Sequence, residues 1–141
     1  KQGLCTLDSL PDLGIEFQQS SKDKTRSYAK SHLQIVRQYL RSLVEAIAWL
    51  KDERNRQEAQ QIMAAFIRNQ DRELMDNMYD SLVKKVFRPV PYPTVEAAQN
   101  VLDQLALTNP KAKLAKPQDF IDDRFLRELE ESGFIKGLYR R

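Results

Sequence analysis

The chain has 141 residues, of which 41% are hydrophobic and 30% charged, and it carries a net charge of +3 at pH 7. This length and composition fit a single soluble globular domain with one core, and no apolar run approaches the ~20 residues of a membrane-spanning helix. Residues 1–80 hold 12 basic and 12 acidic residues, so the positive excess is small and C-terminal, which argues against nucleic acid as a partner.

Residues 1–30 predict a loop or short-strand entry into the fold. Pro11 and Gly14 interrupt this stretch, and the sequence GLCTL at residues 3–7 is compatible with a short strand. Residues 18–25 are polar throughout, which favours an exposed loop.

The strongest predicted element is an amphipathic helix over residues 31–51. Its apolar positions recur every three or four residues, which is the helical period. They are Leu33, Val36, Leu40, Leu43, Ile47 and Leu50. Ser31 and Gln34 have the spacing of a capping box at its start.

Two further helices are expected before residue 88. The first covers residues 57–67, and the second begins after Asp71, a typical N-cap residue. The inward side chains predicted for them are Ala59, Ile62, Met63 and Phe66 in the first helix, and Leu74, Met75, Met78 and Leu82 in the second.

A proline-rich strap follows at residues 88–93. Pro89, Pro91 and Pro93 each fix their own φ and push the preceding residue toward an extended conformation. We therefore expect residues 88–93 to form a stiff extended crossing that delivers the chain to a new helix, with Thr94 as its N-cap. The apolar face expected for this helix is Val95, Ala98, Leu102 and Leu105.

Residues 107–120 predict a solvated loop that contains Lys111, Lys113 and Lys116. A last helix is expected over residues 121–131, with a stop at Ser132–Gly133. Its predicted inward residues are Phe125, Leu126 and Leu129, followed by an apolar tail of Phe134, Ile135 and Leu138. The predicted fold class is thus mainly α, with about five helices, a helical body over residues 31–141 and at most short strands near the N-terminus.

The residue inventory predicts no enzyme, no catalytic residues, no metal site and no cofactor. Cys5 is the only cysteine and His32 the only histidine, so neither a disulfide within the chain nor a Cys/His zinc site can form. We expect Cys5 to be a small buried hydrophobe. Asp76 and Asp80 have a spacing that could ligate a metal, but helix surfaces show this spacing constantly. No nucleotide-binding or EF-hand motif is present.

Four stretches in order resemble the C-terminal part of one transport family. They are KQGLCTLDSLPDLGIEFQ, TRSYAKSHLQIVRQYLRSLVEAIAWLK, VFRPVPYPTVEAAQNVLDQLA and NPKAKLAKPQDFIDDRFLRELEESGFIKGLY. Together they are similar to the nitrate/sulfonate/taurine-type substrate-binding proteins of ABC transporters, which have the type II periplasmic-binding fold. Members have two α/β lobes joined at a hinge, and the resemblance implies that this chain is a fragment or truncated relative of such a protein.

The resemblance implies a protein that acts in the periplasm or elsewhere outside the cytoplasm. Its expected partners are a small-molecule ligand, where the cleft is complete, and the membrane permease of the transporter. The polar positions nearest the family's hinge are Gln18, Ser20 and Ser21, which are therefore the candidate ligand-binding residues, with plain loop residues as the alternative. The chain departs from the family where relatives carry a mostly apolar strand, because residues 19–24 read QSSKDK.

A second function class stays open from the sequence. The same framework could serve as a helical protein-interaction or self-association module, for example as a homo-oligomer, without ligand transport. A third alternative is weak contact with nucleic acid through Lys84, Lys85, Arg88 and the lysines of residues 111–116.

Overall fold

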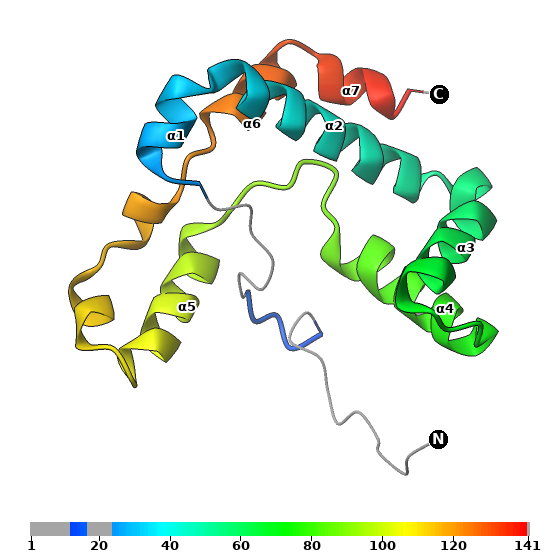
Figure 1. Ribbon diagram of the computed structural model, residues 1–141, viewed down its shortest axis with the longest axis horizontal. Helices are drawn as coiled ribbons and strands as arrows, with labels where there is room; N and C mark the ends of the chain where they lie inside the picture. The colour runs from blue at the N-terminus through cyan, green and yellow to red at the C-terminus, as the bar shows by residue number, and fades with distance from the viewer. Residues whose placement is uncertain (1–11, 17–23, 141) are drawn as a thin grey trace. The chain divides into compact units, whose positions relative to one another are not determined.

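A computed structural model describes residues 12–16 and 24–140 (Figure 1). These residues are mainly helical and include no β-strand, which confirms the predicted mainly-α class. Their α-helices are α1 (Arg26–Ser31), α2 (Leu33–Lys51), α3 (Arg56–Ile67), α4 (Arg72–Tyr79), α5 (Val95–Ala106), α6 (Arg124–Glu131) and α7 (Phe134–Leu138). Short 3₁₀ turns are η1 (Glu53–Asn55), η3 (Pro110–Leu114) and η4 (Pro117–Phe120), and η2 (Asp80–Val86) is a π-helix. The strand expected at residues 3–7 and Cys5 lie outside the described residues.

The chain divides into two compact units. Unit 1 comprises residues 1–24 and 93–123, and its described part is built on α5, which contacts both η3 and η4. Ala97, Leu102 and Pro117 are its buried side chains among the described residues. Unit 2 comprises residues 25–92 and 124–141 and holds the other helices.

The first core of unit 2 lies where α2 meets α6 and α7. Val44, Leu126 and Ile135 are buried there, one from each helix. Half-buried side chains surround them, namely Leu40, Val90, Tyr92, Leu129, Phe134 and Leu138. The predicted helix after residue 121 and its apolar tail therefore pack as expected. Gly133 ends α6 with a φ of 76°, the left-handed conformation predicted for the stop.

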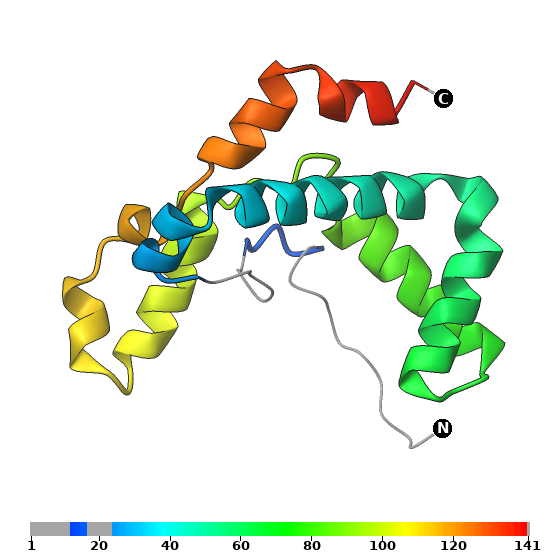
Figure 2. The same ribbon diagram turned by 45° about the horizontal axis from the view of Figure 1, so that its top comes forward.

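The second core of unit 2 joins the end of α2 to α3, α4 and η2. Ala59, Tyr79 and Val83 are buried, with Trp49, Leu50, Met63 and Phe87 packed around them. α3 and α4 run side by side, as Figures 1 and 2 show. Asp71 caps α4 by accepting a hydrogen bond from the Leu74 amide at 3.1 Å, which confirms the predicted N-cap.

The predicted inward face of α3 is only half correct. Ala59 is buried and Met63 half-buried, but Ile62 and Phe66 are exposed, Phe66 by 87%. The face that meets α4 uses a small side chain, because Ala59 packs with Tyr79 of α4 in this core. The predicted inward face of α5 is also only partly correct. Val95 and Leu105 were expected to face inward but are exposed, whereas the small Ala97 is buried.

The start of the long helix differs from the capping-box prediction. Ser31 is the last residue of a separate short helix, α1, and its hydroxyl donates backward to the Ser27 carbonyl at 2.9 Å. His32 is the N-cap of α2 and makes no side-chain cap bond. Thr25 caps α1 instead, since its hydroxyl accepts from the Tyr28 amide at 3.2 Å. A six-residue helix with no buried residue leaves no periodic signal in the sequence.

The proline strap is non-helical over residues 88–93, as predicted, but it bends. The Tyr92 amide donates to the Val90 carbonyl at 2.9 Å, which makes a tight turn instead of a straight crossing. Within unit 2 the strap is fastened by the Tyr139 hydroxyl, which donates to the Pro89 carbonyl at 3.3 Å. The Tyr92 hydroxyl also donates to Glu130 at 2.8 Å.

Candidate functional site

The predicted ligand-binding residues Gln18, Ser20 and Ser21 lie outside the described residues. The nearest described residue before them, Glu16, is held against α5 in unit 1. Its carboxylate accepts a hydrogen bond from the Thr94 hydroxyl at 2.5 Å, and its backbone carbonyl accepts from the Asn100 side chain at 2.6 Å. Thr94 also accepts from the Ala97 amide at 3.1 Å, so the predicted N-cap of α5 is confirmed.

A first surface hollow of about 330 Å³ lies at the break between α1 and α2. Its lining is one continuous stretch, residues 30–35. The break arises at His32, whose ring stacks on Tyr28 with the ring centres 4.2 Å apart. The His32 Nδ1 lies 2.9 Å from the Ser31 hydroxyl and 3.2 Å from the Tyr28 carbonyl, so the imidazole closes the end of α1.

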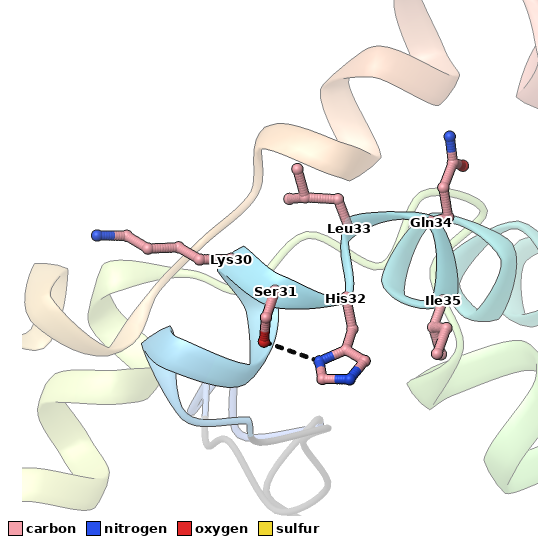
Figure 3. A pocket seen from close by; sticks show the side chains of 6 residues that line it. All are labelled: Lys30, Ser31, His32, Leu33, Gln34 and Ile35. Atoms are coloured by element: carbon pink, nitrogen blue, oxygen red, sulfur yellow. Dashed lines mark hydrogen bonds between the residues drawn. The ribbon is translucent and has the colours of Figure 1, made fainter.

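This hollow lies in a basic part of the sequence but lacks the geometry of an anion site. Residues 25–44 contain four basic side chains and no acidic one, and the amino end of α2 adds a partial positive charge. In Figure 3, however, the Lys30 side chain extends away from the other five side chains, and Gln34 and His32 lie on different sides of the chain. Since the donors do not converge on one point, the stretch alone cannot enclose a small anion.

A second hollow of about 750 Å³ lies at the carboxyl end of α2. It is lined by Glu45, Ala46, Ala48, Trp49, Asp52, Arg54, Asn55 and Leu138. Arg54 contacts Asp52 with an Nη2–Oδ2 distance of 2.6 Å, and its hydrogen bonds lower the pKa of Asp52 to about 2. The side-chain amide of Asn55 donates to the Trp49 carbonyl at 2.9 Å. These polar groups therefore form the turn after α2, and the lining residue Glu45 accepts a hydrogen bond from Arg41 at 3.4 Å.

Asp76 and Asp80, the pair with metal-like spacing, both bind Arg56. The Arg56 guanidinium donates to Asp80 at 2.7 Å and to Asp76 at 3.0 Å, and it lies over the Tyr79 ring at 4.6 Å from the centre. These hydrogen bonds lower the pKa of both carboxyl groups. The pair therefore anchors α3 to α4. The sequence alone did not indicate this anchoring role, because Arg56 lies 20 positions before Asp76 and 24 before Asp80.

The described ranges contain no group of three side chains suited to hold a metal ion. The Ser31–His32 contact is the nearest approach to a nucleophile beside a base. The His32 Nδ1 in this contact is also within hydrogen-bond distance of the Tyr28 carbonyl, and both contacts lie at an exposed helix end. The contact therefore closes the end of α1.

The described part of the chain is thus a mainly helical framework, with a surface hollow at each end of α2. No protein-family model, no curated protein and no solved structure matches the chain. Among the described helices, none combines the length and the apolar character that crossing a bilayer requires.

Proposed function

We propose that this chain is the C-terminal part, or a truncated relative, of the substrate-binding component of an ABC transporter for small anions such as nitrate or organic sulfonates. In this role a ligand is captured between two lobes outside the cytoplasm and passed to a membrane permease. This chain would supply helices that support one wall of the cleft, and Gln18, Ser20 and Ser21 would lie nearest the hinge.

The observation that carries the proposal is the ordered series of four family-like stretches that spans most of the chain. Structural roles found for the motif residues support it. Thr25 and Thr94 each cap the helix at which a quoted stretch begins or continues, and Gly133 ends α6. Residues that begin and end helices are the ones that two proteins with the same helical framework would be expected to share.

The exposed apolar side chains also favour the proposal that this chain is part of a larger protein. Exposed large hydrophobic side chains occur in both units, including Phe66 in unit 2 and Leu107 in unit 1. Burying apolar area contributes about 25 cal/mol per Å², so a body that covers these side chains would gain stability. A second lobe would be such a body.

The test begins with the reading frame upstream of the Lys1 codon, which should encode an α/β lobe. The complete gene product is then titrated calorimetrically with nitrate, taurine, alkanesulfonates and pyrimidines. Binding of one anion, weakened by the joint change of Gln18, Ser20 and Ser21 to Ala, is the expected result. Ser42→Ala, an exposed change on α2, is the matched control. A frame without a second lobe, together with no heat from any ligand, would overturn the proposal.

A second candidate function, self-association, is favoured by one surface. Ile62 and Phe66 lie one helical turn apart on α3, and both are exposed. Light scattering over a concentration series tests this candidate, and Phe66→Ser should lower the measured mass of any oligomer. Phe120→Ser, which removes an exposed phenyl ring from unit 1, is the control. A monomer at every concentration would contradict self-association.

A further inference from the structure

The strongest unexplained feature of unit 1 is the segment that follows α5. Leu107, Leu114 and Phe120 are 84%, 87% and 68% exposed, and all three belong to this one segment. We call residues 105–120 the basic–apolar surface. The segment makes two short 3₁₀ turns, η3 and η4, that lie against α5 (Figures 1 and 2).

The burial pattern of this segment is inverted. Its small side chains face inward, since Pro117 is buried and Ala112 and Ala115 are half-buried. Leu114 and Phe120, which have much more apolar area to hide, remain exposed. Exposing a Leu or Phe side chain forgoes a large part of the hydrophobic gain of folding, so the arrangement suits a surface that is covered by a partner.

Three lysines accompany the exposed apolar side chains. Lys111, Lys113 and Lys116 are all exposed, and no acidic residue lies between Asp103 and Asp119. Lys111 and Leu114 are three residues apart in η3, and side chains at this spacing in a 3₁₀-helix lie on the same side. No ion pair found in the described ranges uses any of the three lysines. The segment therefore presents the Lys111 ammonium group beside the exposed Leu114 side chain, and it carries two more exposed lysines close by in the sequence.

The composition favours a lipid surface over a protein surface. Protein interfaces are depleted in Lys and take most of their binding energy from Trp, Tyr and Arg, none of which occurs in residues 105–120. Lysines beside Leu and Phe are typical of segments that lie in the membrane interface, where the ammonium groups meet anionic headgroups and the apolar tips reach the acyl boundary.

We propose that the basic–apolar surface docks onto a bilayer that contains anionic lipid, with Leu107, Leu114 and Phe120 entering the interface and the three lysines facing the headgroups. The charge complementarity is between these lysines and the lipid phosphates. This inference does not rest on the proposed transport function, because vesicle binding needs neither a transported ligand nor a second lobe.

The test is flotation of the full chain with vesicles of phosphatidylcholine alone and of phosphatidylcholine with about 30% phosphatidylglycerol. Binding to the anionic vesicles only is expected, with a partition coefficient that falls at least tenfold between 50 mM and 500 mM salt, because salt screens the lysines. Replacing Lys111, Lys113 and Lys116 together by Gln should weaken binding roughly 100-fold, about fivefold per lysine.

The apolar contribution is tested separately. Leu114→Ser and Phe120→Ser should each weaken binding at least tenfold, and the triple change of the lysines to Arg should retain it. Phe66→Ser is the matched control, because Phe66 is as exposed as Leu114 but lies on α3 in unit 2. All these residues are exposed, so the far-UV circular dichroism should stay that of the parent chain.

Equal binding to both kinds of vesicle, or unchanged binding by the triple Gln variant, would overturn the proposal. Absence of vesicle binding would also overturn it and would leave a protein surface as the partner of the exposed side chains. Loss of binding in Phe66→Ser to the same extent as in Phe120→Ser would assign the effect to general hydrophobicity and likewise count against this surface.

Discussion

Tyr79→Phe is the sharpest test of how the second core of unit 2 is held. The Tyr79 side chain is fully buried, at 0% exposure, and its hydroxyl donates to the Leu50 carbonyl at 2.6 Å. Leu50 lies in the last turn of α2, where carbonyls lack intrahelical partners. The amide four residues on, that of Arg54, donates to Asp52 instead, at 3.1 Å. The tyrosine hydroxyl thus satisfies a helix-end carbonyl through a tertiary contact.

The expected loss of stability follows from that geometry. Removing the hydroxyl deletes a hydrogen bond with a net value of about 1 kcal/mol and leaves a part-buried carbonyl without its partner, which costs about 1–3 kcal/mol. We therefore expect Tyr79→Phe to lower the free energy of unfolding by about 2 kcal/mol. Tyr79→Ala, which also opens a cavity between α3 and α4, should lower it by about 3–5 kcal/mol.

The assay is urea unfolding followed by tryptophan fluorescence and far-UV circular dichroism. Trp49 is the only tryptophan and packs in the same cluster, so its emission reports on this core directly. Tyr39→Phe is the control, because Tyr39 is 45% exposed and its hydroxyl loss should change the free energy of unfolding by less than about 0.5 kcal/mol. Equal losses for the two variants would refute the reasoning.

The same side chain predicts an alkaline effect. Burial raises the pKa of Tyr79, because it disfavours the phenolate. A group whose folded pKa exceeds its unfolded value of about 10 contributes stability that is complete below that pH and disappears as the pH rises through the folded pKa. The parent chain should therefore lose stability more steeply above pH 10 than Tyr79→Phe does, as measured by urea midpoints at stepwise pH.

Three further predictions concern local contacts. The Asp52 carboxyl should titrate with a midpoint of about 2 by carbon NMR, and Arg54→Ala should return it toward about 3.9; a midpoint unmoved by the change would exclude the ion pair as the cause. Thr94→Ala should cost about 2 kcal/mol in urea unfolding, because it removes both the helix cap and the bond to Glu16, and a double-mutant cycle with Glu16→Gln should give a coupling of about 1 kcal/mol; additive losses would contradict the contact. Gly133→Ala should cost about 1–2 kcal/mol, because an L-residue is strained at a φ of 76°; an unchanged thermal midpoint would show that α6 ends differently.

Local sequence signals predicted the helices that carry strong caps and long stripes. Asp71, Thr94 and Gly133 act where the sequence placed them, because a cap or a left-handed glycine depends only on neighbours a few residues away. The long helix α2 was found for the same reason, since its apolar period repeats over five turns, although Leu33 is exposed and the buried Val44 was missed.

The elements that were missed depend on distant residues. η2 is a π-helix, and its Val83 carbonyl accepts a hydrogen bond from the Lys51 ammonium at 2.7 Å, a contact over 32 positions. Which side chains are buried also depends on residues that are distant in the sequence. Ile62 and Phe66 fit the helical period as well as Ala59 does, and only the closeness of α4 decides which of them is covered. The predicted binding residues near residue 20 lie outside the described part of the chain and remain a prediction.

The two exposed apolar surfaces differ in charge, and this difference separates their partners experimentally. On α3, Ile62 and Phe66 form an exposed apolar surface, and its burial in an oligomer would be driven by the hydrophobic effect, which added salt does not weaken. On the basic–apolar surface, apolar tips are interleaved with lysines, so attraction to an anionic partner must fall as the Debye length shortens from about 10 Å at 0.1 M to about 3 Å at 1 M. Self-association through α3 should therefore persist at high salt while vesicle binding is lost. If both fell together on adding salt, one surface would carry both activities, and the separate roles assigned to the two units would be wrong.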